Sequence, residues 1–350
     1  MRPDTDLDFG HPQWPRLWWT AIRCPHTPKV SLIVTLSRRP LLSAAAAVAL
    51  LLVAGCGSSS GSSAGSVLGS IKVEGTDAEK APTVTLSTKP LKPKVTESKV
   101  LTEGTGAVVG KEDVTMINAL VVNATDGKVI NDTWAAGASA PVDLGAADVF
   151  PAIKSQVPGK KVGSRILIAA PMKDVFGVNG NQAAGLAATD SVVFVVDVKA
   201  AATPLKEAKG EAVAPKEGLP TVTVESGKPA TVTVPSGATA PTDLVIQPLI
   251  TGAGAEVADG QTVRVTYTGA LWKDGSVFDS SASREPGFFE FPVGQGKVIS
   301  GWDKALKGQK VGSRLLVVVP PAEGYGEAGS PPKIAGDDTL VFVIDILAVY

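Results

Sequence analysis

The stretch that decides the fold is "VTYTGALWKDGSVFDSS", residues 265–281. Apolar and polar residues alternate from Val263 to Tyr267, which predicts a strand with one apolar face. The pair Asp274-Gly275 follows and predicts a tight hairpin turn. The returning segment places an aromatic side chain beside a carboxylate, at Phe278 and Asp279. Sheet formation alone does not require this pair, so we expect it to serve a site.

The part of the chain that follows this hairpin resembles an earlier part of the chain. "VPGKKVGSRILIAAP" (157–171) corresponds to "LKGQKVGSRLLVVVP" (306–320), and "DSVVFVVDV" (190–198) corresponds to "DTLVFVIDI" (338–346). Self-similarity over about a hundred residues is typical of tandem domains of one fold and is too long for a solenoid repeat.

Each copy contains several alternating strand segments and one short helix candidate. In the second copy the helix is predicted from Ser300 to Leu306, because Trp302, Ala305 and Leu306 share one helical face and Gly308 follows as a stop. One short helix among many strands indicates an α+β domain with a twisted antiparallel sheet.

Composition shifts divide the chain into five predicted segments. They are a signal region (1–56), a flexible tether and connector that could include an added strand (57–97), a first domain (98–200), a linker (201–237) and a second domain (238–350).

The first segment has the pattern of a signal peptide. Arg38-Arg39 precede a short apolar run that ends in "VAGC", with Cys56 as its last residue, and a Ser/Gly tract follows. This motif matches a bacterial lipobox, so we expect Cys56 to be lipidated and the protein to be anchored to the outer face of the cell membrane. The alternatives are an ordinary secretion signal that contains Cys and, on weaker similarity, a twin-arginine signal. The first thirty residues fit neither, which leaves a start at Val30 or Val34, or a long disordered leader.

Charge and residue types exclude several kinds of chemistry. The net charge of −1 predicts no attraction to nucleic acid. His11, His26 and Cys24 all precede Cys56, so a mature chain would contain no histidine and no free thiol. A Ser-His-Asp triad, a cysteine nucleophile and a His/Cys zinc site are therefore excluded there. We expect no metal and no cofactor.

The second copy resembles the FKBP-type peptidyl-prolyl cis-trans isomerases over residues 245–350. The resemblance rests on the opening stretch and on "FPVGQGKVISGWDKALKGQKVGSR", "VVPPAEGYGEAG" and "TLVFVIDIL", which keep the order and spacing of the family. It implies a twisted antiparallel sheet curled around one short helix.

The resemblance also implies a proline pocket. Its catalytic positions fall on Tyr267, Phe278, Asp279, Trp302, Tyr325 and Phe342, and its further substrate-binding positions fall on Arg284, Phe289, Val298, Ile299 and Ile334. Trp302 would be the floor, and Asp279 and the N–H of Ile299 would lie near the bound carbonyls. Ser330 and Ala335 depart from the family pattern, which affects substrate preference more than activity.

An aromatic pocket suits proline isomerisation. Twisting a peptide bond breaks amide resonance and costs about 18–20 kcal/mol. The twisted amide is less polar, so a dry pocket favours the transition state without a nucleophile or a titrating base. The expected partners are proline-containing unfolded or exported proteins and macrolides of the tacrolimus and rapamycin type. A non-catalytic client-binding or chaperone lipoprotein is the alternative, and a structural surface lipoprotein is a third hypothesis.

The first copy keeps the frame but loses the pocket residues. Aligned by sequence, Tyr267, Phe278, Asp279, Phe289, Trp302 and Tyr325 become Asn118, Ile130, Asn131, Ala140, Ile153 and Phe176, while Val149, Phe150 and Phe194 resemble their counterparts. We expect a degenerate domain of the same fold that binds clients or acts as a spacer; an altered but active pocket is the other interpretation.

Overall fold

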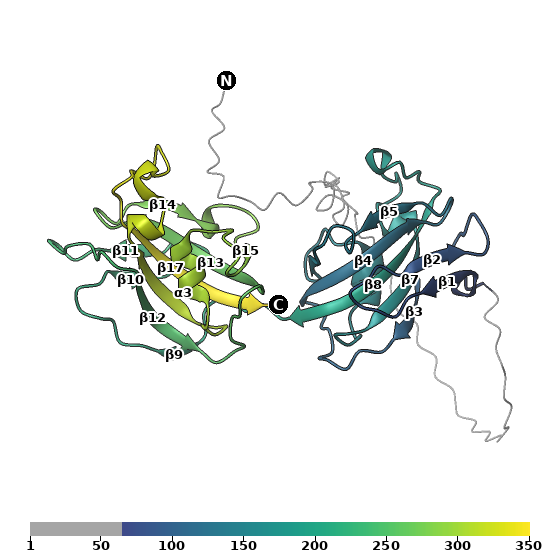
Figure 1. Cartoon of the computed structure of the whole chain (residues 1–350), viewed down its shortest axis with the longest axis horizontal. Coiled ribbons are helices and arrows are strands. Elements are labelled where there is room, and N and C mark those ends of the chain that lie inside the picture. The colour runs from purple at the N-terminus through teal and green to yellow at the C-terminus, as the bar shows by residue number, and fades with distance from the viewer. Residues whose placement is uncertain (1–64) are drawn as a thin grey trace, which may run out of the picture.

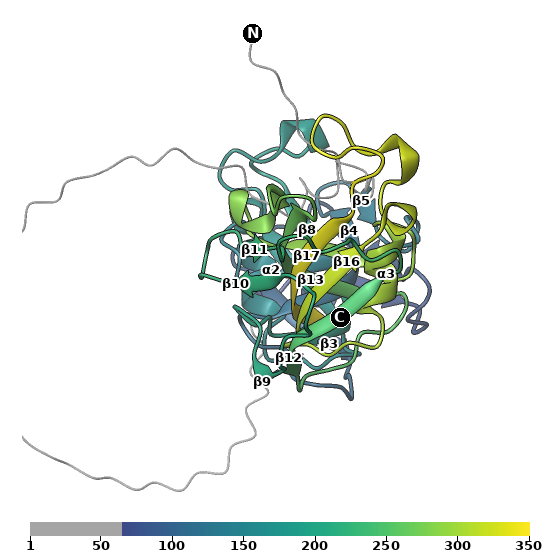
Figure 2. The same cartoon turned by 90° about the vertical axis from the view of Figure 1, so that its left-hand side faces the viewer.

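The structure is a computed structural model that describes residues 65–350, so Cys56 and the predicted signal region lie outside the described residues. Two antiparallel sheets, one for each copy of the repeat, follow one another along the long axis of the molecule (Figure 1). The view along that axis places the second sheet in front of the first (Figure 2). Within residues 65–350 no helix is long and apolar enough to cross a membrane.

The first sheet has six strands in the order β3-β7-β8-β4-β5, with β6 also pairing with β4. Its strands are β3 (Glu97–Thr102), β4 (Val114–Asn123), β5 (Val129–Asp132), β6 (Ala140–Asp143), β7 (Arg165–Pro171) and β8 (Ser191–Ala202).

The second sheet has seven strands in the order β14-β13-β17-β16-β12-β9, with β15 also pairing with β13. Its strands are β9 (Gly210–Ala212), β12 (Val245–Gly252), β13 (Thr262–Leu271), β14 (Val277–Ser280), β15 (Phe289–Pro292), β16 (Arg314–Val319) and β17 (Leu340–Val349). The stretch of residues 265–281 forms most of β13 and all of β14, as the Asp-Gly turn predicts.

One short α-helix packs on the inner face of each sheet. These helices are α2 (Pro151–Gln156) and α3 (Ser300–Leu306), and the bounds of α3 are those predicted from its apolar spacing. Short 3-10 turns occur at Leu68–Ser70, Met172–Asp174, Gln182–Ala184, Ser281–Ser283, Pro321–Glu323 and Gly326–Ala328. The predicted α+β class is therefore confirmed.

A small hairpin covers the other face of each sheet, which differs from the sequence prediction. The hairpin of β1 (Ile71–Glu74) and β2 (Thr83–Leu86) packs on the first sheet, where residues 57–97 were expected to be a tether and a connector that could include one added strand. The hairpin of β10 (Thr221–Thr223) and β11 (Thr231–Thr233) packs on the second, and β9 joins that sheet, although residues 201–237 were expected to be a linker.

The physical reason lies in the central strands. Nearly every residue of β7 and β16 is buried, so both faces of each sheet are apolar and each needs a cover. The continuous apolar runs "RILIAA" and "RLLVVV" carry this signal, because a sheet with one solvated face would show alternation.

The two sheets meet end to end near the C-terminus (Figure 1). Val114 of β4 shares a buried apolar cluster with Ala348 and Tyr350. Arg264 of β13 reaches across and donates to Asp143 of β6 at 2.9 Å. The two copies therefore contact each other through both apolar and charged groups.

Candidate active site

Helix α3 brings Trp302 to the centre of the second domain. The helix buries one face, and Trp302 is 4% exposed. The rings of Tyr267 and Phe342 approach the indole edge to face, with centroids 5.1 and 5.2 Å away. Three residues from β13, β17 and α3 thus form the base of a common aromatic cluster.

Further aromatic side chains extend this cluster. The ring centroid of Phe289 lies 6.2 Å from that of Tyr267 and 6.3 Å from that of Trp302. The ring of Phe278 is perpendicular to that of Phe342, with centroids 5.7 Å apart. Sequence reasoning missed Phe291, which is 1% exposed, stacks on Phe289 and lies 5.7 Å from Trp302. The alternation in "FEF" puts both Phe side chains on one face and could have identified it.

Close packing of the rings depends on Gly269 in β13. A Cβ atom at this position would lie 2.6 Å from Phe278 and 2.9 Å from Phe342. Any side chain there would displace one of these rings.

A polar network lies beside the aromatic cluster. The hydroxyl of Tyr267 donates to Asp279, and Arg284 donates to Asp279 at 2.8 Å and to the Tyr267 oxygen. The Asp279 side chain is 8% exposed, whereas that of Arg284 is 44% exposed. Burial, reinforced by Asp279, raises the pKa of Tyr267, so the phenol stays protonated and donates. Asp279 is therefore held in place by two donors.

The remaining predicted positions pack against the same core. Val298, Ile299, Phe289 and Tyr325 are half-buried and Ile334 is buried. Ile299 precedes α3, and its N–H has no hydrogen-bond partner among the described residues, so it can donate to a bound carbonyl. Burial also raises the pKa of Tyr325.

The loop after Tyr325 contains the two positions that depart from the family pattern. Ser330 and Ile334 exchange backbone hydrogen bonds at 2.8 and 3.0 Å, and the N–H of Ala335 donates to Asp338 at 2.7 Å. The loop therefore has a fixed backbone despite both replacements.

The site offers desolvation and a few hydrogen bonds. Trp302 Nε1 is the one buried side-chain nitrogen or oxygen without a hydrogen-bond partner in residues 65–350. In the same residues no cluster of His, Cys, Asp or Glu side chains is arranged to hold a metal ion. The geometry suits a neutral, apolar group held next to polar contacts.

Comparisons with known proteins agree with this geometry. A sequence model of the family described as "FKBP-type peptidyl-prolyl cis-trans isomerase" matches residues 108–199 and 254–347, more than half of the chain. The chain belongs to this family. Both copies match, so the tandem FKBP arrangement is confirmed.

Several FKBP relatives are similar to parts of the chain. An FK506-binding protein of Streptomyces anulatus is 41% identical over 114 residues, which cover 32% of this chain and 91% of that protein. Peptidyl-prolyl cis-trans isomerase FKBP15-2 of Arabidopsis thaliana is 50% identical over 91 residues, 26% of this chain and 54% of the relative. The 39 kDa FK506-binding nuclear protein of Drosophila melanogaster is 41% identical over 101 residues, 29% of this chain and 28% of the relative.

A similarity also exists to a solved structure. The crystal structure of the three FKBP domains of wheat FKBP73 has 18% sequence identity and a TM-score of 0.30, covering 73% of this chain and 94% of that chain. Among the sequence relatives, the matched part of the chain spans about half of the Arabidopsis protein and less than a third of the Drosophila protein.

In the first FKBP copy the strand register corrects one predicted correspondence. Val121 pairs with both Asn131 and Phe194, as Gly269 pairs with Asp279 and Phe342. Two residues earlier along each strand, Tyr267 therefore corresponds to Ala119. The predicted match to Asn118 was wrong by one residue, because the two strands share too few residues to fix their alignment.

The predicted correspondences that lie on paired strands, at Ile130, Asn131, Ala140 and Phe194, agree with the register. Ile117 pairs with Ala140 as Val265 pairs with Phe289, so Ala140 stands where the second copy has a ring. Asn118 instead accepts hydrogen bonds from Thr133 at 3.4 Å and Ser139 at 2.8 Å.

Proposed function

We propose that the second FKBP domain is a peptidyl-prolyl cis-trans isomerase that acts by desolvation. The observation that carries the proposal is the aromatic cluster around Trp302 with the Tyr267–Asp279–Arg284 network beside it. A proline ring on the indole face would lie among apolar walls, with the Ile299 N–H available to a carbonyl. The less polar, twisted amide gains relative to the planar one in such surroundings.

The test uses two variants that leave most of the pocket shape unchanged. Asp279→Val removes the acceptor for Tyr267 and Arg284, and Tyr325→Phe removes one hydroxyl. We expect Asp279→Val to lower kcat/KM for a proline tetrapeptide about tenfold, since that factor needs about 1.4 kcal/mol and a hydrogen bond to a charged group contributes about 1.5–3 kcal/mol. Tyr325→Phe should lower it less, and both should weaken binding of tacrolimus- or rapamycin-like macrolides. Full activity of both folded variants would show that the pocket is assigned wrongly.

We further propose that the protein assists the folding of exported proteins while anchored by a lipid at the outer face of the membrane. The support is the lipobox motif that ends at Cys56. Cys56→Ala should release the protein from the membrane fraction or block its processing. Membrane association of this variant at the wild-type level would contradict the anchor.

Client holding without catalysis is the second candidate function. It is favoured by the first copy, which keeps the FKBP frame but has Ile153 and Asn131 in place of Trp302 and Asp279. Refolding of a proline-limited protein, measured beside tetrapeptide isomerisation, separates the two functions.

A further inference from the structure

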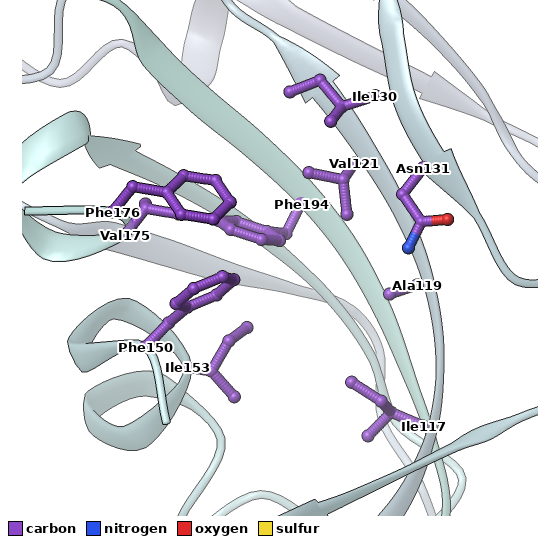
Figure 3. A pocket seen from close by; sticks show the side chains of 10 residues that line it. All are labelled: Ile117, Ala119, Val121, Ile130, Asn131, Phe150, Ile153, Val175, Phe176 and Phe194. Carbon is purple, nitrogen blue, oxygen red and sulfur yellow. The ribbon is translucent and has the colours of Figure 1, made fainter. Parts of the chain in front are cut away.

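The first copy contains a cavity of about 30 Å³ between its sheet and helix α2. Figure 3 shows three aromatic rings, Phe150, Phe176 and Phe194, on one side of it. Phe150 and Phe176 meet edge to face at 4.9 Å. Ile153 of α2 lies beside Phe150, and the aliphatic residues Ile117, Ala119, Val121 and Ile130 lie on the other side of the cavity (Figure 3).

The residues on the sheet side of this cavity differ from those of the second copy in a coordinated way. Val121 stands where the second copy has Gly269, a position at which any Cβ would collide with Phe278. The counterpart of Phe278 is Ile130, which leaves room for Val121. The side-chain volumes at these two positions are therefore matched to each other and give an aliphatic wall.

The size and lining of the cavity select its occupant. At about 30 Å³ the cavity is small beside a benzene-binding cavity of about 150 Å³. Water needs two to four polar partners, and the cavity wall is almost entirely apolar. The branched end of an aliphatic side chain suits this apolar lining better than water does.

One polar group lies at the rim of this cavity. Asn131 Oδ1 accepts a hydrogen bond from the N–H of Asp132 at 2.8 Å, which fixes the orientation of the amide. Its nitrogen lies on the side of Ala119 in Figure 3, and no hydrogen bond to the other described residues engages it. It can donate to a carbonyl oxygen next to the cavity. In an extended peptide, each Val, Leu or Ile residue carries a branched aliphatic side chain close to a backbone carbonyl group.

We propose that the first FKBP copy binds an extended polypeptide segment by burying the branched end of one Val, Leu or Ile side chain in this cavity, while Asn131 donates to a carbonyl of the same segment. The site needs no proline and shares no residue with the pocket of the second copy. It would let the protein recognise apolar stretches of unfolded chains independently of isomerisation.

Methyl NMR on the full chain tests this proposal. The probes are two capped pentapeptides that differ only at the central residue, acetyl-Gly-Gly-Val-Gly-Gly-amide and its Asp counterpart. We expect the Val peptide to shift the methyl signals of Ile117, Ile130 and Ile153, and the Asp peptide to leave them in place.

Three variants locate the binding. Ala119→Leu fills the cavity and should weaken binding of the Val peptide at least tenfold. Asn131→Ala removes the donor without adding volume and should weaken it several-fold. Val129→Ala, a change at an exposed residue of the same strand, should have no effect.

The proline tetrapeptide rate of the second copy, measured on the same samples, should stay constant, so this proposal and the isomerase proposal fail separately. Absence of shifts with the Val peptide would overturn the inference. Equal shifts with the Asp peptide, or unchanged binding by both Ala119→Leu and Asn131→Ala, would overturn it as well.

Discussion

Tyr267, Tyr325 and Tyr350 are the only tyrosines of the chain, and burial raises the pKa of each. Tyr267 and Tyr325 stand at the predicted pocket positions of the second copy, and Tyr350 donates to Glu290 at the junction of the two copies. At each position the neutral phenol is the form that the folded protein stabilises. The three hydroxyl groups therefore stay protonated to a higher pH than an exposed tyrosine does.

A spectrophotometric titration checks this account of the three phenols. An unperturbed tyrosine is half ionised at about pH 10, so we expect almost no phenolate absorbance from the folded chain at that pH. The unfolded state loses these protons first, so their contribution to stability is complete below about pH 10 and is lost as the pH rises further. Half-maximal phenolate absorbance at pH 10 in the folded protein would contradict the burial of these rings.

A single residue of the site could be placed from the sequence when the residues around it also match the family pattern. Trp302 and Tyr325 lie in long stretches that match the family pattern and could be placed from the sequence. Ala119 could not, because only the hydrogen bonds between the strands determine which residue faces the cavity. Phe291 could not be placed from the family pattern, because that pattern marks the residues that line the pocket and Phe291 lies in the buried layer behind them.

At the scale of elements, the hairpin of β10 and β11 belongs to the second domain. Val232 and Ala230 are buried against the sheet, and the N–H of Ala230 donates to Thr268 at 2.9 Å. The sequence predicted a linker over residues 201–237 because the stretch up to Pro220 is rich in Lys, Pro, Glu and Ala. A short hairpin whose apolar residues are few gives a weak periodic signal, and only the two-sided apolar strands behind it indicate that a cover is needed.

Two fragments of the second copy test the role of this hairpin. A chain that begins at Thr203 keeps β9, β10 and β11, whereas a chain that begins at Ala238 lacks them. We expect the shorter chain to unfold in urea with a free energy at least about 3 kcal/mol lower, since burying one Val-sized side chain contributes about 1.5–3 kcal/mol and several are uncovered. Equal free energies of unfolding would show that the hairpin does not stabilise the domain.

Point changes provide the matched control for these fragments. Val232→Ser in the longer chain should reproduce part of the loss in stability. Val224→Ser should not, because Val224 is 38% exposed, whereas Val232 is 6% exposed.

At the scale of the whole molecule, one fold is used twice with different pocket chemistry. The repeat could be predicted from the sequence, and so could the loss of Trp and Asp from the first copy. The contact between the copies could not, because Asp143 and Arg264 lie 121 positions apart and carry no pattern that relates them. Arg264 is 6% exposed and also donates to Glu290 at 2.6 Å, next to the pocket residue Phe289.

The central claim is that proline isomerisation belongs to the second pocket alone. The most direct test gives the full chain the residues of the first copy at two pocket positions, Phe278→Ile and Asp279→Asn. The matched control changes the equivalent pair of the first copy, Ile130→Ala and Asn131→Ala. The measurement is kcat/KM for a proline tetrapeptide. We predict a fall of at least about 100-fold, or about 2.7 kcal/mol, in the first variant and no change in the control. An unchanged rate in the first variant, or an equal fall in both folded variants, would contradict the account.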